Sequence, residues 1–531
     1  MKVLVSDNLG EVGIEMLEAE EGLSVDVKTG LTPAALAEII DDYDGLIIRS
    51  ATRVTEDLLS RATRLKVVGR AGIGLDNVDI PAATHHGVVV MNTPDGNVIT
   101  TAEHAIAMLM SLTRNVPQGT ASLRAGRWDK KLLQGREIFG KTLGVIGFGK
   151  IGSIVADRAR GLRLKVLVYD PHVNPERIQK AGFETVGLEE LYRRADFITI
   201  HVPKLKDTIG LIDQAAFSRM KDGVMLINCS RGGIVKEDDL YAAMVAGKVA
   251  GAALDVFETE PPGDSPLVKL DHLIGTPHLG AATLEAQTNV AVAVVKQIMA
   301  FLKEGVVVNA VNAPSVTGEL LVRLRPFLKL GDQIGCLMPQ LVHGPVKEVS
   351  VEYSGDFQGL DLTPVTTAII KGLLTPTVKD DVNSVNAAVL AKERGIKITE
   401  TTSAESDEFL NLVSVRVVTT EMESKVAGTI YGKKDSRLVR VNNFRLEMIP
   451  MAHMALIHNV DKPGAIGSIG TTLGNHNINI GRMQVGQEEG GNRNIVFLST
   501  DTAIPDDVLE ELRRLPMVKT VMPLEFLECR G

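Results

Sequence analysis

Three charged residues that could carry acid–base chemistry lie far apart in the sequence but at matching positions in its pattern: Arg231, Glu260 and His278. Each follows an apolar stretch of the kind expected for a strand buried in a parallel sheet. The carboxyl ends of such strands meet at one crevice, so the three side chains are expected to converge there. Glu258 lies two residues before Glu260 and is an alternative carboxylate on this reasoning.

These residue types suit the removal of a hydride from an alcohol carbon. A neutral imidazole can accept the hydroxyl proton near pH 7, and a carboxylate can orient that imidazole through its other nitrogen. A planar guanidinium holds a carboxylate in a fixed plane. The set therefore predicts a dehydrogenase that acts on a small 2-hydroxy or 2-oxo acid.

A glycine motif upstream predicts the cofactor site. Gly147, Gly149 and Gly152 form G-x-G-x-x-G directly after the apolar run 142–146, and Asp170 closes the next apolar run. Between a strand and a helix, with an acid about twenty residues on, this motif is typical of dinucleotide binding. The first glycine allows a tight turn, the second admits the pyrophosphate, and the third lets the helix pack on the strand. Asp170 can accept the ribose hydroxyls and no arginine adjoins it, so NAD is favoured over NADP.

Arginines near the start of the chain predict an anion site. Arg49 and Arg70 follow two apolar runs in the first hundred residues, where alternating strand and helix patterns indicate a second parallel sheet. Two arginines at two strand ends can bind an anionic substrate, although arginines also form ordinary surface ion pairs. A basic segment, 124–131, precedes the glycine motif and holds Trp128. A solvated loop is as good an interpretation of that segment as a functional one.

The elements that must position these residues divide into four predicted domains. The class is α/β, with a Rossmann-type nucleotide domain at 98–282 beside a flavodoxin-like substrate domain. The helical pattern 283–307 returns the chain to that substrate domain, which is therefore discontinuous (1–97 and 283–307). After a predicted linker, 305–314, residues 315–446 show an α+β pattern. Residues 452–531 show the βαββαβ order of a ferredoxin-like domain.

Length and composition agree with this organisation. The 531 residues exceed one core. The net charge of −9 gives no reason to expect nucleic acid as a partner. No apolar run approaches the ~20 residues of a membrane span, and the N-terminal residues show no secretory signal. We therefore expect no membrane partner and a cytoplasmic location. The three cysteines are far apart in the sequence, so no cysteine metal site is expected.

Six stretches together resemble the D-isomer-specific 2-hydroxyacid dehydrogenase family: GRAGIGLDNVD, NTPDGNVITTAEHAIAMLMSLTRN, GKTLGVIGFGKIG, NCSRGGIV, LDVFETEPP and TPHLGAAT. They cover residues 1 to about 310. With the trailing domains, the chain is similar to the long-form members of serine biosynthesis, which follow the dehydrogenase unit with an intervening domain (315–446 here) and an ACT domain (452–531 here). The resemblance implies oxidation of 3-phospho-D-glycerate to 3-phosphohydroxypyruvate with NAD by a homo-oligomer, expected to be a homotetramer.

The resemblance also assigns roles to individual residues. The catalytic arginine, glutamate and histidine of the family fall on Arg231, Glu260 and His278, which favours Glu260 over Glu258. Cofactor contacts are implied for Gly147, Gly149, Lys150, Ile151, Gly152, Asp170, Val202, Cys229, Ser230, Arg231, Asp255, His278, Leu279 and Gly280. Substrate contacts are implied for Arg49, Ser50, Arg70, Gly74 and Asn97. Ile73 departs from the threonine of some relatives, where a side-chain bond to the cofactor would form.

The predicted ACT domain implies an amino-acid effector. Relatives bind serine at a turn before Pro-Gly and at an asparagine that begins the second strand. Asn459, Asp461 and Asn479 occupy those positions here, so serine is the expected effector.

Two other functions share parts of this pattern. A glyoxylate or hydroxypyruvate reductase would use the same three catalytic residues, but the trailing domains argue against it. An NAD-sensing binding protein of the corepressor kind could retain the three residues as well, although such proteins lack an amino-acid-binding end domain.

Overall fold

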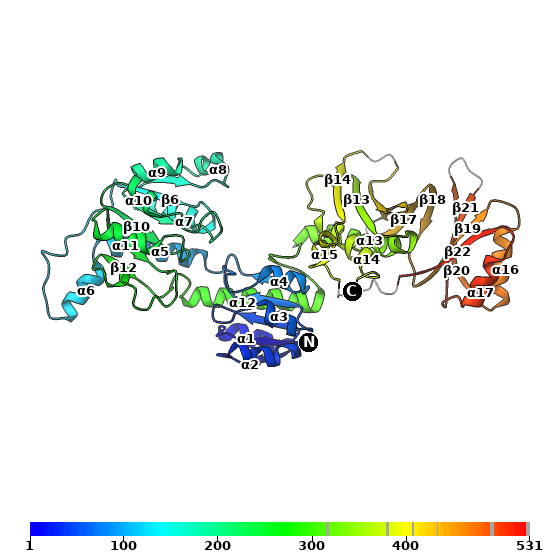
Figure 1. Ribbon diagram of the computed structural model, residues 1–531, viewed down its shortest axis with the longest axis horizontal. Coiled ribbons are helices and arrows are strands. Elements are labelled where there is room, and N and C mark those ends of the chain that lie inside the picture. Colours follow the sequence, from blue (N-terminus) through cyan, green and yellow to red (C-terminus); the bar gives the residue numbers. More distant parts are fainter. Residues whose placement is uncertain (315–317, 379–381, 406–407, 433, 489–492, 527–531) are drawn as a thin grey trace.

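The computed structural model describes residues 1–314, 318–378, 382–405, 408–432, 434–488 and 493–526. In Figure 1 the nucleotide-type unit lies at one end and the C-terminal α+β unit at the other, with the first unit and the intervening unit between them. In the described residues, no helix has the length and apolar character needed to cross a membrane.

The first unit is a five-stranded parallel sheet in the order β2-β1-β3-β4-β5, which is the flavodoxin-like order. Four of its strands, β1, β3, β4 and β5, are buried on both faces because helices cover each side, whereas the edge strand β2 is partly exposed. The strands are β1 (Lys2–Val5), β2 (Ser24–Val27), β3 (Gly45–Ile48), β4 (Val67–Arg70) and β5 (Val89–Asn92). The helices are α1 (Glu11–Glu18), α2 (Pro33–Ile39), the 3₁₀ turn η1 (Ile40–Asp42), α3 (Glu56–Arg61) and α4 (Ile80–His85).

A distant helix completes this unit. Helix α12 (Leu284–Glu304) begins at the N-cap Thr283, whose hydroxyl accepts from the backbone N–H of Ala286. Its buried face joins the core of the first sheet, and a Cβ at Gly69 on β4 would lie only 2.7 Å from Val294. The helix therefore packs where the sequence pattern predicted it. The predicted linker after it is tied down, because the backbone N–H of Val90 donates to Asn312.

The second unit is a seven-stranded parallel sheet in the order β12-β11-β10-β9-β6-β7-β8. The strand order reverses between β6 and β9, the switch point where such sheets bind ligands. The strands are β6 (Thr142–Ile146), β7 (Lys165–Tyr169), β8 (Glu184–Thr185), β9 (Phe197–Ile200), β10 (Val224–Asn228), β11 (Val249–Leu254) and β12 (Leu273–Gly275). The helices are α5 (Val98–Thr113), α6 (Val116–Arg124), α7 (Lys150–Gly161), α8 (Pro175–Lys180), α9 (Leu188–Arg194), α10 (Gln214–Arg219), α11 (Glu237–Val245) and the 3₁₀ turn η2 (Leu267–Lys269). Helix α6 projects away from this sheet (Figure 1).

The C-terminal half shows the expected α+β and βαββαβ patterns. The α+β part contains α13 (Gly318–Leu341), β13 (Val346–Gly355), α14 (Thr363–Leu374), α15 (Ala387–Glu393), β14 (Lys397–Ser403), β15 (Asn411–Thr419), β16 (Glu423–Tyr431), β17 (Asp435–Val441) and β18 (Phe444–Met448). The terminal part contains β19 (His453–Val460), α16 (Ala465–Asn475), β20 (Ile480–Glu488), β21 (Arg493–Thr500), α17 (Asp506–Arg513) and β22 (Val518–Glu525).

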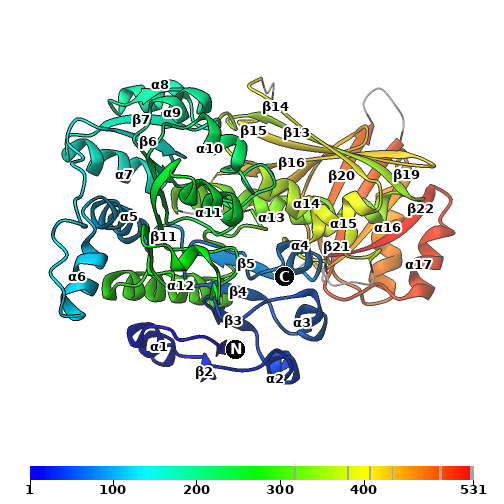
Figure 2. The same ribbon diagram turned by 60° about the vertical axis from the view of Figure 1, so that its left-hand side comes forward.

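These two parts share one sheet, although their strand patterns predict two separate domains. Ten strands run in the order β14-β13-β15-β16-β17-β18-β20-β21-β19-β22. The junction is the short antiparallel pairing of β18 with β20, Phe444 opposite Glu488 and Arg445 opposite Gln487. In Figure 2 the yellow strands of the α+β part and the orange strands of the terminal part belong to this one sheet. The two parts are therefore joined by backbone hydrogen bonds as well as by the connecting chain.

Candidate active site

The glycine motif folds as its spacing predicts. Gly147 has φ +96°, which favours glycine, and a Cβ there would lie 2.5 Å from the carbonyl of His201. Gly149 is the N-cap of α7, and a Cβ there would meet nothing within 4 Å. At Gly152 a Cβ would lie 2.0 Å from the carbonyl of Gly147, so only glycine lets α7 approach the turn. The open space beside Gly149, at a helix N-terminus, fits a pyrophosphate.

Asp170 lies against this turn. Its carboxylate accepts from the backbone N–H groups of Phe148 at 2.7 Å and His172 at 2.9 Å. These bonds fix the carboxylate beside the glycine turn and leave lone pairs for ribose hydroxyls.

His278 and Glu260 form the pair that the sequence predicted. The Nδ1 atom of His278 lies 2.8 Å from Glu260 Oε2, and both side chains are partly exposed. The other carboxylate oxygen of Glu260 accepts from the backbone N–H of Phe257 at 3.1 Å. A carboxylate at Nδ1 leaves Nε2 of the imidazole free to accept a proton.

The structure separates the two candidate carboxylates. Glu258 Oε1 accepts from the backbone N–H of Glu237 at 3.0 Å, at the start of α11, and the N–H of Glu258 donates to the Glu237 carboxylate at 2.5 Å. Glu258 therefore caps a helix, whereas Glu260 contacts the imidazole of His278.

A buried aspartate holds the loop that carries His278. Asp255 is 1% exposed and accepts from the Thr276 hydroxyl at 2.6 Å and from the N–H groups of Leu279 at 2.6 Å and Gly280 at 2.8 Å. Burial raises the pKa of Asp255, but hydrogen bonds from His104 and Thr276 outweigh burial and lower it. The loop needs this support because His278 has φ +53°, a conformation costly for residues other than glycine.

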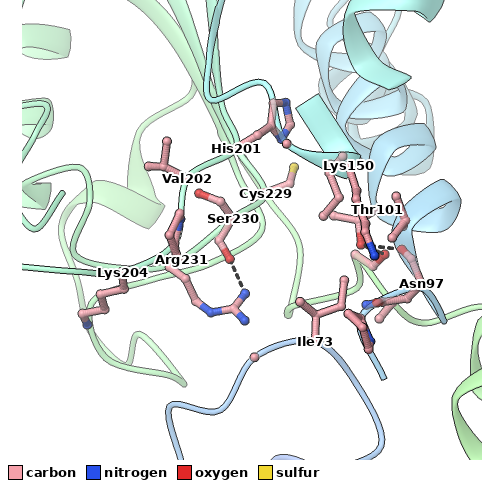
Figure 3. A pocket seen from close by; sticks show the side chains of 18 of the residues that line it. Ile73, Asn97, Thr101, Lys150, His201, Val202, Lys204, Cys229, Ser230 and Arg231 are labelled. Carbon is pink, nitrogen blue, oxygen red and sulfur yellow. Dashed lines mark hydrogen bonds between the residues drawn. The ribbon is translucent and has the colours of Figure 1, made fainter. Parts of the chain in front are cut away.

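Gly149, Asp255 and His278 line one cleft between the two sheets, with a cavity volume of about 480 Å³. The predicted residues Gly147, Gly152, Asp170, Glu260 and Leu279 are not among those that line it. Figure 3 shows Val202, Cys229, Ser230 and Arg231 on one side of it and Asn97 and Thr101 on the other. Of the predicted cofactor residues, those that line the cleft are Gly149, Lys150, Ile151, Val202, Cys229, Ser230, Arg231, Asp255, His278 and Gly280. Of the predicted substrate residues, Arg70, Gly74 and Asn97 line it, whereas Arg49 and Ser50 do not.

Two cleft residues have polar atoms ready for a ligand. The Oδ1 atom of Asn97 and the Nε atom of Arg70 are buried and have no hydrogen-bond partner among the described residues. Burial, and then the nearby charges of Arg231 and Arg49, lower the pKa of Arg70 to about 10. The cleft therefore favours an anion, which would relieve the repulsion among these arginines. Arg49 itself donates to the carbonyl of Asn8 at 3.0 Å.

Sequence reasoning missed several cleft residues. Asp76, Thr101, Lys204 and His201 line it without having been assigned a role. Desolvation of its ring lowers the pKa of His201 to about 4, and its Nε2 lies 2.9 Å from the Thr199 hydroxyl. In the sequence, only the position of His201 directly after a strand indicated that it could belong to the site. Burial also raises the pKa of the neighbouring Cys229 thiol.

The predicted effector residues lie at two opposite ends of the terminal unit: Asn459 and Asp461 are near the end of β20, and Asn479 is at its start. Asn459 is 1% exposed on β19 and its Oδ1 has no partner among the described residues. Asp461 is exposed in the turn before α16, 3.4 Å from the Gln487 amide. Asn479 is exposed and immediately precedes β20, one residue outside the strand that it was expected to begin.

Comparisons with known proteins match three stretches of the chain to family models. Family models described as the NAD binding domain of D-isomer specific 2-hydroxyacid dehydrogenase, the D-3-phosphoglycerate dehydrogenase intervening domain and the ACT domain match residues 106–280, 323–442 and 453–516. Among solved structures, the TT0316 protein of Thermus thermophilus is 34% identical, with TM-score 0.54, covering 59% of this chain and all of that one. A D-lactate dehydrogenase of Aquifex aeolicus, complexed with NAD and lactic acid, is 30% identical, with TM-score 0.53, over 59% of this chain and all of that one.

Curated relatives match over nearly the full length. A D-3-phosphoglycerate dehydrogenase of Synechocystis is 42% identical over 98% of this chain and 93% of its own. The enzyme of the same name from Bacillus subtilis is 41% identical over 99% of both chains. The chain therefore belongs to the D-3-phosphoglycerate dehydrogenases, within the D-isomer-specific 2-hydroxyacid dehydrogenase family.

Proposed function

We propose that this protein oxidises 3-phospho-D-glycerate to 3-phosphohydroxypyruvate with NAD. The observation that carries the proposal is the His278–Glu260 pair, 2.8 Å apart, beside a cleft lined by Arg231 and the glycine turn of a nucleotide-binding sheet. Bound in this cleft, NAD would supply the acceptor for the hydride of the hydroxyl-bearing carbon. The open space at Gly149 and the carboxylate of Asp170 would hold its pyrophosphate and ribose.

The chain's own residues supply the proton chemistry. His278 Nε2 accepts the hydroxyl proton as the carbon–oxygen double bond forms, and Glu260 stabilises the resulting imidazolium through Nδ1. Arg231 holds the substrate carboxylate, and Arg70 attracts the phosphate with help from Arg49. The unpartnered Asn97 Oδ1 is placed to accept a hydrogen bond from the substrate or the cofactor.

The test measures NADH formation from NAD and 3-phosphoglycerate at alkaline pH. In the reverse direction, it measures NADH consumption with glyoxylate and with hydroxypyruvate. Preference for the phosphorylated pair supports the proposal. A preference for glyoxylate or hydroxypyruvate would make the protein a reductase. NAD binding without turnover on any of these substrates would make it a binding protein.

We propose the domain boundaries 1–97 with 283–307, 98–282, 315–446 and 452–531; the last two domains share one ten-stranded sheet. We also propose that serine is the effector and that the protein is a homotetramer. The exposed apolar side chains on and after α6, Leu123, Trp128 and Leu132, support self-association. The cytoplasmic location expected from the sequence stays a prediction.

The effector proposal rests on the terminal unit. Serine carries an ammonium and a carboxylate, and the unit offers an exposed carboxylate on Asp461 and an exposed amide on Asn479. These two groups lie at opposite ends of β20, so one serine would contact both only where two copies of the unit meet. Calorimetric titration of serine into wild type and Asp461→Ala, with rate assays, tests it. Loss of both binding and inhibition in Asp461→Ala supports the site, whereas equal binding to both proteins places the effector elsewhere.

A further inference from the structure

The guanidinium of Arg231 is held from both walls of the cleft. Its Nε donates to the carboxylate of Asp76 at 2.9 Å, and its Nη1 donates to the carbonyl of Ser230 at 2.7 Å. Asp76 belongs to the first sheet's unit, 155 positions away from Arg231 in the chain. The bond to Asp76 therefore orients Arg231 from across the cleft, where no bond within its own unit could.

The backbone beside Asp76 is shaped for this approach. A Cβ at Gly74 would lie 1.9 Å from Arg231 Nη2 and 3.0 Å from Asp76 Oδ2. Because Gly74 has no side chain, Nη2 of Arg231 can approach the backbone of this turn. Asp76 uses Nε and the Ser230 carbonyl uses one hydrogen of Nη1, so the edge formed by Nη1 and Nη2 keeps free donors. That edge has the geometry to bind a carboxylate with two parallel hydrogen bonds.

Charge gives Asp76 a second role. Arg231 and Arg49 both disfavour the charged form of Arg70, whereas Asp76 favours it. A carboxylate between arginines lets them lie close together before any substrate is present. Asp76 is 56% exposed as a side chain, so its placement depends on the bond to Arg231 rather than on packing.

We propose that Asp76 is a positioning residue that presents the Nη1–Nη2 edge of Arg231 to the carboxylate of the substrate. The identity of the substrate in this proposal rests on the proposed function. The recognition of a carboxylate by Arg231 rests on the geometry alone. The opposite possibility is that Asp76 competes with the substrate for Arg231. The two differ in sign, because loss of a positioning residue weakens substrate binding and loss of a competitor strengthens it.

The experiment compares Asp76→Ala, Asp76→Asn and the surface control Asp222→Asn, whose carboxylate is 92% exposed and pairs with Lys248. We expect Asp76→Ala to raise the KM for 3-phosphoglycerate at least about tenfold and to lower kcat about threefold or less. Asp76→Asn retains an acceptor and should fall between Asp76→Ala and wild type. NAD affinity and unfolding should stay at wild-type values in all three. An unchanged or lower KM in Asp76→Ala overturns the proposal, as does an equal loss of NAD binding.

A second measurement separates this proposal from the proposed function. Oxalate, a small dicarboxylate, is titrated calorimetrically into each protein loaded with NADH. Weaker oxalate binding by Asp76→Ala supports the positioning role even if wild type does not oxidise 3-phosphoglycerate, and unchanged binding refutes it. In the Arg231→Lys background, which lacks Nε, Asp76→Ala should have no further effect on oxalate affinity; an additive loss would also refute the role.

Discussion

The two glycines that flank the start of α7 should separate stability from cofactor binding. A Cβ at Gly152 would lie 2.0 Å from the carbonyl of Gly147, whereas one at Gly149 would meet nothing within 4 Å. A carbon and an oxygen normally lie about 3.3 Å apart. Gly152→Ala must therefore move helix and turn apart by about 1 Å, at a cost of about 3 kcal/mol for overpacking.

Alanine recovers part of that cost, because it favours a helix interior over glycine by about 1 kcal/mol. The net loss for Gly152→Ala is about 2 kcal/mol, or about thirtyfold in the unfolding equilibrium of this unit. Gly149→Ala should lose only about 0.5 kcal/mol, since alanine is a poorer N-cap than glycine. Its methyl group projects instead into the space that fits a pyrophosphate. We expect its Kd for NAD to rise at least about tenfold, which corresponds to about 1.4 kcal/mol.

Hydrogen exchange of peptides from β6 and α7 measures the local stability, because a chain with several units does not unfold in one step. Calorimetry measures NAD affinity. The reasoning fails if Gly152→Ala keeps wild-type protection. It also fails if Gly149→Ala loses protection as strongly as Gly152→Ala, since the two methyl groups would then not differ in what they meet.

Three further predictions concern single residues. His278→Gln should bind NAD normally and lose turnover by about two to four orders of magnitude, the value of a general base; near-normal hydride transfer in stopped flow would remove His278 from the mechanism. Wild type should prefer NAD to NADP at least about tenfold, and Asp170→Ala should narrow the ratio of the two kcat/KM values, because the carboxylate repels a 2′-phosphate. The pKa of His201 is lowered from 6.5 to about 4 in the folded protein. Between these two pH values the unfolded chain binds a proton on this histidine and the folded chain does not. The free energy of unfolding should therefore fall by up to about 2 kcal/mol on this account when the pH is lowered from 7 to 5. The same pH change should reduce the stability of His201→Gln by a correspondingly smaller amount than that of wild type.

The sequence predicted the parts of this site that local chemistry dictates. The three glycines have positions that only a strand–turn–helix requires, and Arg231 and His278 follow strands that parallel pairing brings together. The choice of Glu260 over Glu258 needed the resemblance, because both residues follow the same strand. In the fold it depends on the partner at the start of α11, Glu237, which no spacing rule identifies.

Other features depend on contacts across the chain that periodicity does not encode. Asp76 stands in an ordinary loop, and its role appears only when the two sheets face each other across the cleft. His104 faces Asp255 from α5, a helix whose pattern predicted only a connection. The ten-stranded sheet depends on two residue pairs between β18 and β20. A pairing of only two residues on each strand does not change the alternation of apolar and polar residues, so the sequence predicted two separate domains.

The shared sheet and two side-chain hydrogen bonds define a candidate path from the terminal unit towards the cleft. From β20 it passes through β18 into the intervening unit, where the Asn383 amide donates to the carbonyl of Gly87 at 2.9 Å. Gly87 precedes β5, and Asn92 at the end of β5 donates to the carbonyl of the cleft residue Ile73 at 2.7 Å. Contact alone does not prove coupling, but a cut in the path discriminates. Asn383→Ala should leave the uninhibited rate and serine affinity intact and weaken inhibition by serine. Full inhibition in Asn383→Ala would show that the signal passes elsewhere, for example between subunits.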